Sequence, residues 1–195
     1  MTMFSRKKKD TTFEVIAKEL SGAPSVNETI EWKRSAEVVV GGLIAVGFFE
    51  DRESPNLDML LAVGSRGQTI IDCQSGNVVY RNRNQDGYDH DTLTAWDLSG
   101  GNPDPVRMSG VGGGGLKRFT SDGWSVEAIP VKWPIFYYVL QHPGSSVFSD
   151  YKLGRKPKFD LLENDYQQMA WGFSNSGNSL LLTSSSDIII WSRSF

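Results

Sequence analysis

The sequence is poor in the residues that most often carry chemistry. Its 195 residues include one cysteine, Cys73, and two histidines, His90 and His142. A single cysteine excludes an intramolecular disulfide and is typical of a reducing compartment, so we expect a cytoplasmic protein. Too few cysteines and histidines are present for a typical zinc site. The sequence also offers few residues for nucleophilic catalysis, because only two imidazoles could act as a base and no Gly-x-Ser-x-Gly motif is present.

An excess of positive charge and a long apolar run are lacking as well. The 20 Lys and Arg and 23 Asp and Glu give a net charge of −3, without the excess of positive charge that is typical of nucleic-acid-binding proteins. The longest apolar stretch, residues 38–49, is interrupted by glycines and is shorter than the ~20 residues that span a bilayer. Residues 1–10 contain the basic run Arg6–Lys9 and no apolar core of a signal peptide, so we expect a flexible basic tail. We therefore predict neither nucleic acid nor a membrane as a partner.

Glycine and tryptophan are abundant instead. The 20 glycines and six tryptophans, together with many β-branched residues, indicate short strands joined by tight turns. Strand-like runs recur about every 8–12 residues in several parts of the chain after residue 37. A hairpin turn is expected at residues 74–77, where Gly76 can take a positive φ. The predicted fold is all-β, either a propeller-like sheet array or a two-sheet β-sandwich with one short N-terminal helix.

That helix is predicted over residues 11–21. Thr11 and Glu14 have the spacing of a capping box, and apolar residues then recur on one face. We expect the helix to pack on a single, mainly β domain that covers residues 11–195. A shorter helical turn is expected around residues 161–167.

Two parts of the chain, residues 44–73 and 169–192, repeat one pattern. Residues 44–48 (Ile-Ala-Val-Gly-Phe) align with residues 169–173 (Met-Ala-Trp-Gly-Phe). Each copy continues with a polar turn, an apolar strand, a turn of small residues and a third strand.

The second copy contains Gly172-Phe173-Ser174, then Ser186-Asp187, and its third strand ends in Ile190-Trp191. This pattern resembles a β-propeller blade of the WD-repeat family, and the first copy, ending in Asp72-Cys73, looks like a related blade. The resemblance implies a non-catalytic scaffold that binds another protein through its loops or rim.

A glycine-rich block, residues 112–115, precedes Leu116 and Lys117. A phosphate-binding loop would need a Gly-Lys-Ser/Thr ending and a following helix, and neither is expected here. The block therefore indicates a bulged or flexible approach to a strand. Together with the segment Thr120–Trp124 it resembles segments of small uncharacterised bacterial proteins, a resemblance that implies no role.

The tryptophans and Cys73 divide into buried and exposed candidates. Trp124, Trp171 and Trp191 lie in expected strands and are predicted to be core residues. Cys73 alternates with apolar neighbours and is also expected in a core. Trp96 lies in a polar segment and is the best candidate for an exposed anchor.

Two long polar segments, residues 82–105 and 141–160, interrupt the strand pattern. Loops of this length are usually functional, so we predict a binding or scaffolding protein without catalysis that recognises another protein through them. An aromatic residue flanked by charge is typical of an interface anchor. The predicted contact residues are Tyr88, Asp89, Asp91, Trp96 and Arg155.

Residues 86–91 form the densest acidic cluster. Asp86, Asp89 and Asp91 could hold calcium through carboxylate oxygens, although the register of an EF-hand is absent. The alternative function is therefore a small carbohydrate-binding module or hydrolase that uses this loop. A third interpretation is a solvated turn in which the side chains cap backbone N–H groups.

Overall fold

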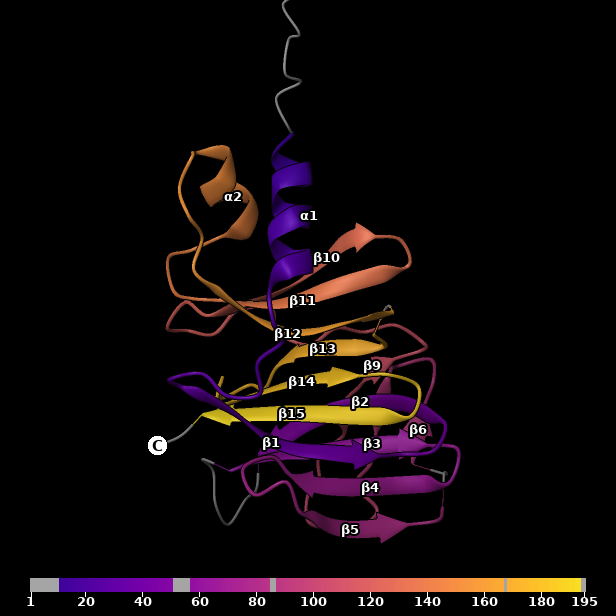
Figure 1. The fold of residues 1–195 in the computed structure, drawn as a ribbon. Coiled ribbons are helices and arrows are strands. Elements are labelled where there is room, and N and C mark those ends of the chain that lie inside the picture. The colour runs from indigo at the N-terminus through magenta and orange to yellow at the C-terminus, as the bar shows by residue number, and fades with distance from the viewer. Residues whose placement is uncertain (1–10, 51–56, 85–86, 167, 194–195) are drawn as a thin grey trace, which may run out of the picture.

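A computed structural model describes residues 11–50, 57–84, 87–166 and 168–193. The predicted basic tail, residues 1–10, and the predicted metal ligand Asp86 lie outside the described residues. Within these ranges the chain forms four antiparallel sheets and two short helices (Figure 1). The prediction of an all-β protein with a helix near its N-terminus is confirmed, and the strands form an array of four small sheets.

Each sheet is named here by its main consecutive strands. The β2–β5 sheet contains, in spatial order, β5 (Val78–Asn82), β4 (Gly67–Asp72), β3 (Asp58–Gly64), β2 (Leu43–Glu50) and β9 (Ser109–Gly110). The β13–β15 sheet contains β1 (Trp32–Val39), β15 (Asp187–Arg193), β14 (Ser179–Thr183) and β13 (Ala170–Phe173). The β10–β12 sheet contains β10 (Ser125–Lys132), β11 (Ile135–Gln141) and β12 (Phe159–Tyr166). The β6–β8 sheet contains β6 (Tyr88–Asp89), β7 (Thr94–Ala95) and β8 (Val106–Arg107).

The two copies of the sequence repeat fold into similar units. Strands β2, β3 and β4 form an antiparallel meander, and so do β13, β14 and β15. In the second unit, β1 from the N-terminal part of the chain adds a fourth strand by pairing with β15, with Val38 opposite Ile188. The hairpin predicted at residues 74–77 joins β4 to β5, and Gly76 has a φ of +74°.

The β13–β15 sheet lies at the centre of a stack and is covered on both faces. Leu181 on one face packs in an apolar cluster with Leu60 of the β2–β5 sheet. On the other face, Leu182 and Trp191 pack with Tyr138 of the β10–β12 sheet. Alternate residues of one strand therefore enter two different cores, which explains why every residue of β14 is buried and why its centre is an unbroken run of three leucines.

The outer faces of the neighbouring sheets are covered in turn. The β2–β5 sheet packs its Leu61 with Ala95 of the β6–β8 sheet. The β10–β12 sheet packs its Val139 against Ile16 of α1 (Thr12–Gly22). Figure 1 shows the resulting order, with the helices at one end, then the β10–β12, β13–β15 and β2–β5 sheets.

Helix α1 begins as its sequence predicts. The Thr11 N–H donates to Glu14 Oε2 at 2.6 Å, and the Glu14 N–H donates to Thr11 Oγ1 at 3.3 Å, so the capping box is present. Ile16 and Leu20 are buried against the β10–β12 sheet. Neither α1 nor the other helix of the described residues has the length and apolar character needed to cross a membrane.

The segment 141–166 differs from its prediction in two places. Residues 147–152, expected as part of a loop, form the short helix α2 (Val147–Lys152), whose first N–H groups include that of Val147, bonded to Gln141 Oε1 at 2.6 Å. The helical turn expected at residues 161–167 is wrong, because residues 161–166 belong to β12. Leu161 and Leu162 face different cores, so the strand shows an unbroken apolar pair rather than alternation.

The glycine-rich block lies close to another part of the backbone. A Cβ on Gly114 would lie 2.3 Å from the carbonyl oxygen of Met108. Gly113 also exchanges hydrogen bonds with Gly110 at the end of β9. The glycines are therefore explained by packing against the chain.

Candidate functional site

The predicted contact segment 82–105 presents an exposed tryptophan directly after strand β7. The Trp96 side chain is 52% exposed, whereas Ala95 before it and Asp97 after it are buried. Exposure of Trp96 was predicted from the sequence and is confirmed. Large aromatic side chains normally bury most of their surface, so an indole exposed in this way is a candidate contact residue, a property that it shares with Trp133.

Buried Gln68 of β4 fixes the backbone on both sides of Trp96. Gln68 is 1% exposed, and its Nε2 donates to the Trp96 carbonyl at 2.8 Å while its Oε1 accepts from the Leu98 N–H at 3.2 Å. The Trp96 N–H donates to the carbonyl of Gly87 at 2.8 Å. The Tyr80 hydroxyl donates to the Leu98 carbonyl at 3.1 Å. The exposed indole therefore stands on a backbone held in place from β4, β5 and the start of β6.

Asp97 organises the loop that follows. Its buried carboxylate accepts the N–H of Ser99 at 2.7 Å and that of Asn102 at 2.8 Å. These bonds give the polar stretch between β7 and β8 a defined path. Sequence reasoning missed both Gln68 and Asp97, although an Asp followed two residues later by Ser is a recognisable turn signal.

The described part of the acidic cluster forms a capped turn. Asp89 Oδ1 accepts the N–H of Asp91 at 2.8 Å and that of Thr92 at 3.2 Å. Hydrogen bonds from these backbone groups, chiefly that of Thr92, lower the pKa of the Asp89 carboxyl. Asp91 itself is exposed. In the described ranges no three His, Cys, Asp or Glu side chains gather closely enough to hold a metal ion together.

Tyr88 lies beside this turn and is half-buried. Its ring contacts the His90 ring edge-on, with the centroids 4.4 Å apart. Burial, and then the nearby Asp89 carboxylate, raise the pKa of the Tyr88 hydroxyl. Tyr88, Asp89, Asp91 and Trp96 thus belong to one locally ordered segment around β6 and β7.

Arg155 lies in a different part of the molecule. It follows α2, and its N–H donates to the Asp150 carbonyl at 2.7 Å. In Figure 1, α2 is beside α1 at one end of the stack, well away from β6. The two polar segments predicted as contact loops therefore present separate surfaces.

A buried polar cluster joins the β2–β5 and β13–β15 sheets. Asp58 at the start of β3 is 4% exposed and accepts hydrogen bonds from the hydroxyls of Ser174 at 2.7 Å, Ser176 at 2.8 Å and Ser179 at 2.8 Å. Burial is also the main cause that raises the pKa of the nearby Cys73 thiol well above its usual range. Cys73 is in a core, as predicted. The cluster is enclosed between two sheets, and its hydrogen bonds stabilise the contact between them.

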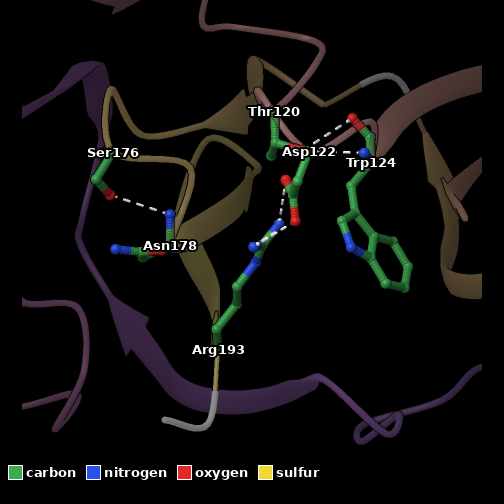
Figure 2. Close-up of polar contacts among 6 residues, drawn as sticks. All are labelled: Thr120, Asp122, Trp124, Ser176, Asn178 and Arg193. Carbon is green, nitrogen blue, oxygen red and sulfur yellow. Dashed lines mark hydrogen bonds and ion pairs between the residues drawn. The ribbon is translucent and has the colours of Figure 1, made fainter. Parts of the chain in front are cut away.

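A second polar contact lies at the outer edge of the stack and is drawn in Figure 2. Arg193 of β15 donates from both Nη atoms to Asp122, at 2.7 and 2.9 Å, and its guanidinium lies over the ring of Trp32 at 4.8 Å. The arginine hydrogen bonds lower the Asp122 pKa to about 2. In the same turn the Trp124 N–H donates to Thr120 Oγ1 at 2.9 Å. This bidentate pair fixes the turn before β10 to the C-terminal strand.

The remaining aromatic predictions are largely confirmed. Trp124 and Trp191 are buried core residues, whereas Trp171 is half-buried with the Arg118 guanidinium over its ring at 3.8 Å.

Compared with known proteins, the chain matches no family model and no curated protein.

Proposed function

We propose that the protein is a non-catalytic binding or scaffolding protein that recognises another protein through the segment 82–105, with Trp96 as the central anchor. The observation that carries the proposal is the half-exposed indole on a backbone fixed by Gln68. Tryptophan is enriched among the few residues that dominate interface energies. A backbone that is already ordered loses little conformational freedom on binding, which favours affinity.

The polar neighbours act at the rim of this contact. Asp89 and Asp91 are exposed, and Tyr88 offers a half-buried ring with a hydroxyl. Charges at a rim orient an incoming partner and affect association rate more than affinity. We therefore assign the main part of the binding energy to Trp96 and partner selection to the carboxylates.

Arg155 and the segment 141–160 form an outer contact in this proposal. Because α2 lies away from β6, a partner that reaches Arg155 must extend along the stack of sheets (Figure 1). Replacing Arg155 should consequently weaken binding less than replacing Trp96.

The scaffold interpretation also draws on the blade resemblance of residues 44–73 and 169–192. Both copies form three-stranded meanders, and successive sheets pack face to face, an arrangement that propeller blades share. We propose a propeller-like array of the WD-repeat kind that works in the cytoplasm, where a single unpaired cysteine stays reduced.

The experiment is affinity capture of the tagged protein from its native lysate, compared among three forms. Wild type should retain a dominant partner, and Trp96→Ala should lose it because the anchor is removed. Trp133→Ala is the matched control, since Trp133 is also exposed, at 75%, but lies in the turn between β10 and β11. The control should retain the partner.

Two outcomes would overturn the proposal. One is equal capture of the partner by wild type and Trp96→Ala. The other is a capture that contains no protein above the level of an untagged control, which would direct the search to small ligands.

A further inference from the structure

A positively charged hollow lies beside the β3–β4 hairpin and includes Asn82 and Arg83 from the first residues of the segment 82–105. Its volume is about 950 Å³, and it is bordered by the β1–β2 turn, the β3–β4 hairpin and the end of β5. The charged residues that line it are Arg66, Arg81 and Arg83, and its other lining residues among those described are uncharged. Three positive charges thus converge on one recess of a protein whose net charge is −3.

The walls of the hollow are held in fixed positions by backbone contacts. The Ser65 N–H donates to the Gly42 carbonyl at 2.8 Å, and the Ser65 hydroxyl donates to the Gly41 carbonyl at 3.0 Å. These bonds attach the β3–β4 hairpin to the β1–β2 turn. On the other side, Gly67 packs so closely on β5 that a Cβ there would lie 2.0 Å from the Asn82 carbonyl oxygen. The recess is therefore built from tightly joined turns.

Strand register places two of the arginines beside β4, and the third belongs to the β3–β4 hairpin. Arg81 lies opposite Thr69 in the β4–β5 pair, and Arg83 directly follows Asn82, the partner of Gln68. Arg66 crosses towards the β1–β2 turn, with its Nε 3.8 Å from the position of a Cβ on Gly41. None of the three forms an ion pair with a carboxylate of the residues that the structure describes. All three residues are exposed, so their guanidinium groups are accessible to an anion from solution.

We propose that this hollow is a binding site for a compact polyanion, a small molecule that carries at least two phosphate or carboxylate groups. Each guanidinium offers five N–H donors in a planar fork that matches phosphate and carboxylate oxygens. A single carboxylate cannot occupy three such groups, whereas a diphosphate or a tricarboxylate can. The volume lies in the range of small-molecule sites, which favours a small ligand over a chain segment of a protein partner.

The test is isothermal titration of the full chain with inorganic pyrophosphate, citrate and acetate at low salt. Pyrophosphate or citrate should bind, and the tighter of the two identifies the phosphate or carboxylate source of the ligand. Acetate should bind at least tenfold more weakly. Affinity should fall as salt is added, because exposed charges are screened. Arg81→Gln and Arg83→Gln should each weaken binding by about tenfold or more, since each removes charge-assisted hydrogen bonds.

The control variant is Arg107→Gln, which removes an exposed arginine of β8 that does not line the hollow. It should bind as wild type does, and far-UV circular dichroism should show that every variant is folded. The proposal is overturned by the absence of heat with both polyanions, or by an equal loss of affinity in Arg107→Gln. Tighter binding of a hexaglutamate peptide than of either small anion would also overturn it and assign the recess to an acidic protein segment. Trp96 does not line the hollow, so these titrations test the anion site separately from the Trp96 anchor.

Discussion

Asp58 is a buried carboxylate whose hydrogen bonds come from hydroxyl groups rather than from a cation. Ser174, Ser176 and Ser179 approach it from the β13–β14 turn, so one side chain joins two sheets that are more than a hundred residues apart in sequence. A buried charge is tolerated when several donors solvate it. The arrangement makes the contact between these sheets specific as well as apolar.

Asp58→Ala should lower the free energy of unfolding by about 3 kcal/mol, because the buried hydroxyls of Ser174 and Ser179 lose their acceptor and a cavity remains. Urea unfolding followed by circular dichroism measures this loss. Asp91→Ala is the control, since Asp91 is exposed, and it should change the value by less than about 0.5 kcal/mol. Equal effects of the two variants would contradict the assigned role of Asp58.

The Asp122–Arg193 pair predicts a dependence of stability on pH. The pKa of Asp122 falls from 3.8 to about 2 on folding, chiefly through the Arg193 hydrogen bonds, so the folded state binds its proton more weakly than the unfolded state does. The stabilisation is therefore present above pH 4 and is lost as the pH falls through about 2. With the Asp122 side chain 47% exposed, solvent limits the contribution to about 1 kcal/mol.

Urea unfolding of wild type and Asp122→Asn between pH 2 and pH 6 tests whether the ionised Asp122 carboxylate stabilises the fold. Wild type should be the more stable protein at pH 6, and the difference should shrink as the pH approaches 2. A difference that stays constant across the range would show that the carboxylate charge is not its source.

At the scale of elements, close backbone approaches fix how hairpins meet. Gly67 has a φ of +107° and faces the Asn82 carbonyl, whereas Gly154 has a φ of +71° with no atom near the position of a Cβ. Both positions have a positive φ, and a side chain at Gly67 would in addition clash with the backbone of β5.

Gly154→Ala should cost about 1 kcal/mol of unfolding free energy, the strain of an L-residue at positive φ. Gly67→Ala should cost about 3 kcal/mol, because β5 must also move away from β4. Urea denaturation of both variants measures the difference. Equal costs would mean that the β4–β5 contact adjusts without strain.

Prediction from sequence succeeded where the signal was local. The capping box of Thr11 and Glu14 defined the start of α1, and the turn at residues 74–77 was identified from its glycine. It failed for α2, which is too short to show a helical period, and for β12, in which the adjacent Leu161 and Leu162 enter different cores.

For the candidate sites, too, prediction from the sequence succeeded for a local feature and failed for contacts between distant parts of the chain. The exposure of Trp96 could be predicted because it lies in a long polar segment, residues 82–105. Gln68, which fixes its backbone, and the recess formed by Arg66, Arg81 and Arg83 depend on strand register and on contacts between distant turns. No local pattern in a single sequence carries that information.

At the scale of the whole molecule, the sheets depend on one another for burial. The β13–β15 sheet is covered on both faces, and its edge strand β1 comes from the other end of the chain. No sheet can leave the stack without exposing an apolar cluster on its neighbour.

Unfolding should consequently be a single cooperative transition. Far-UV circular dichroism reports all four sheets, whereas tryptophan fluorescence is weighted towards Trp32, Trp124 and Trp191 between the β10–β12 and β13–β15 sheets. We expect the same urea midpoint from both signals. Separate midpoints would show that part of the stack unfolds on its own.

Trp96 either binds a partner or stabilises the fold. The free energy of unfolding of Trp96→Ala distinguishes these two roles most directly. The exposed indole predicts a change of less than about 1 kcal/mol. Trp124→Ala, in the core at 3% exposure, should cost about 3–5 kcal/mol in the same measurement. A loss in Trp96→Ala as large as that in Trp124→Ala would place the indole among the structural residues and contradict its role as a binding anchor.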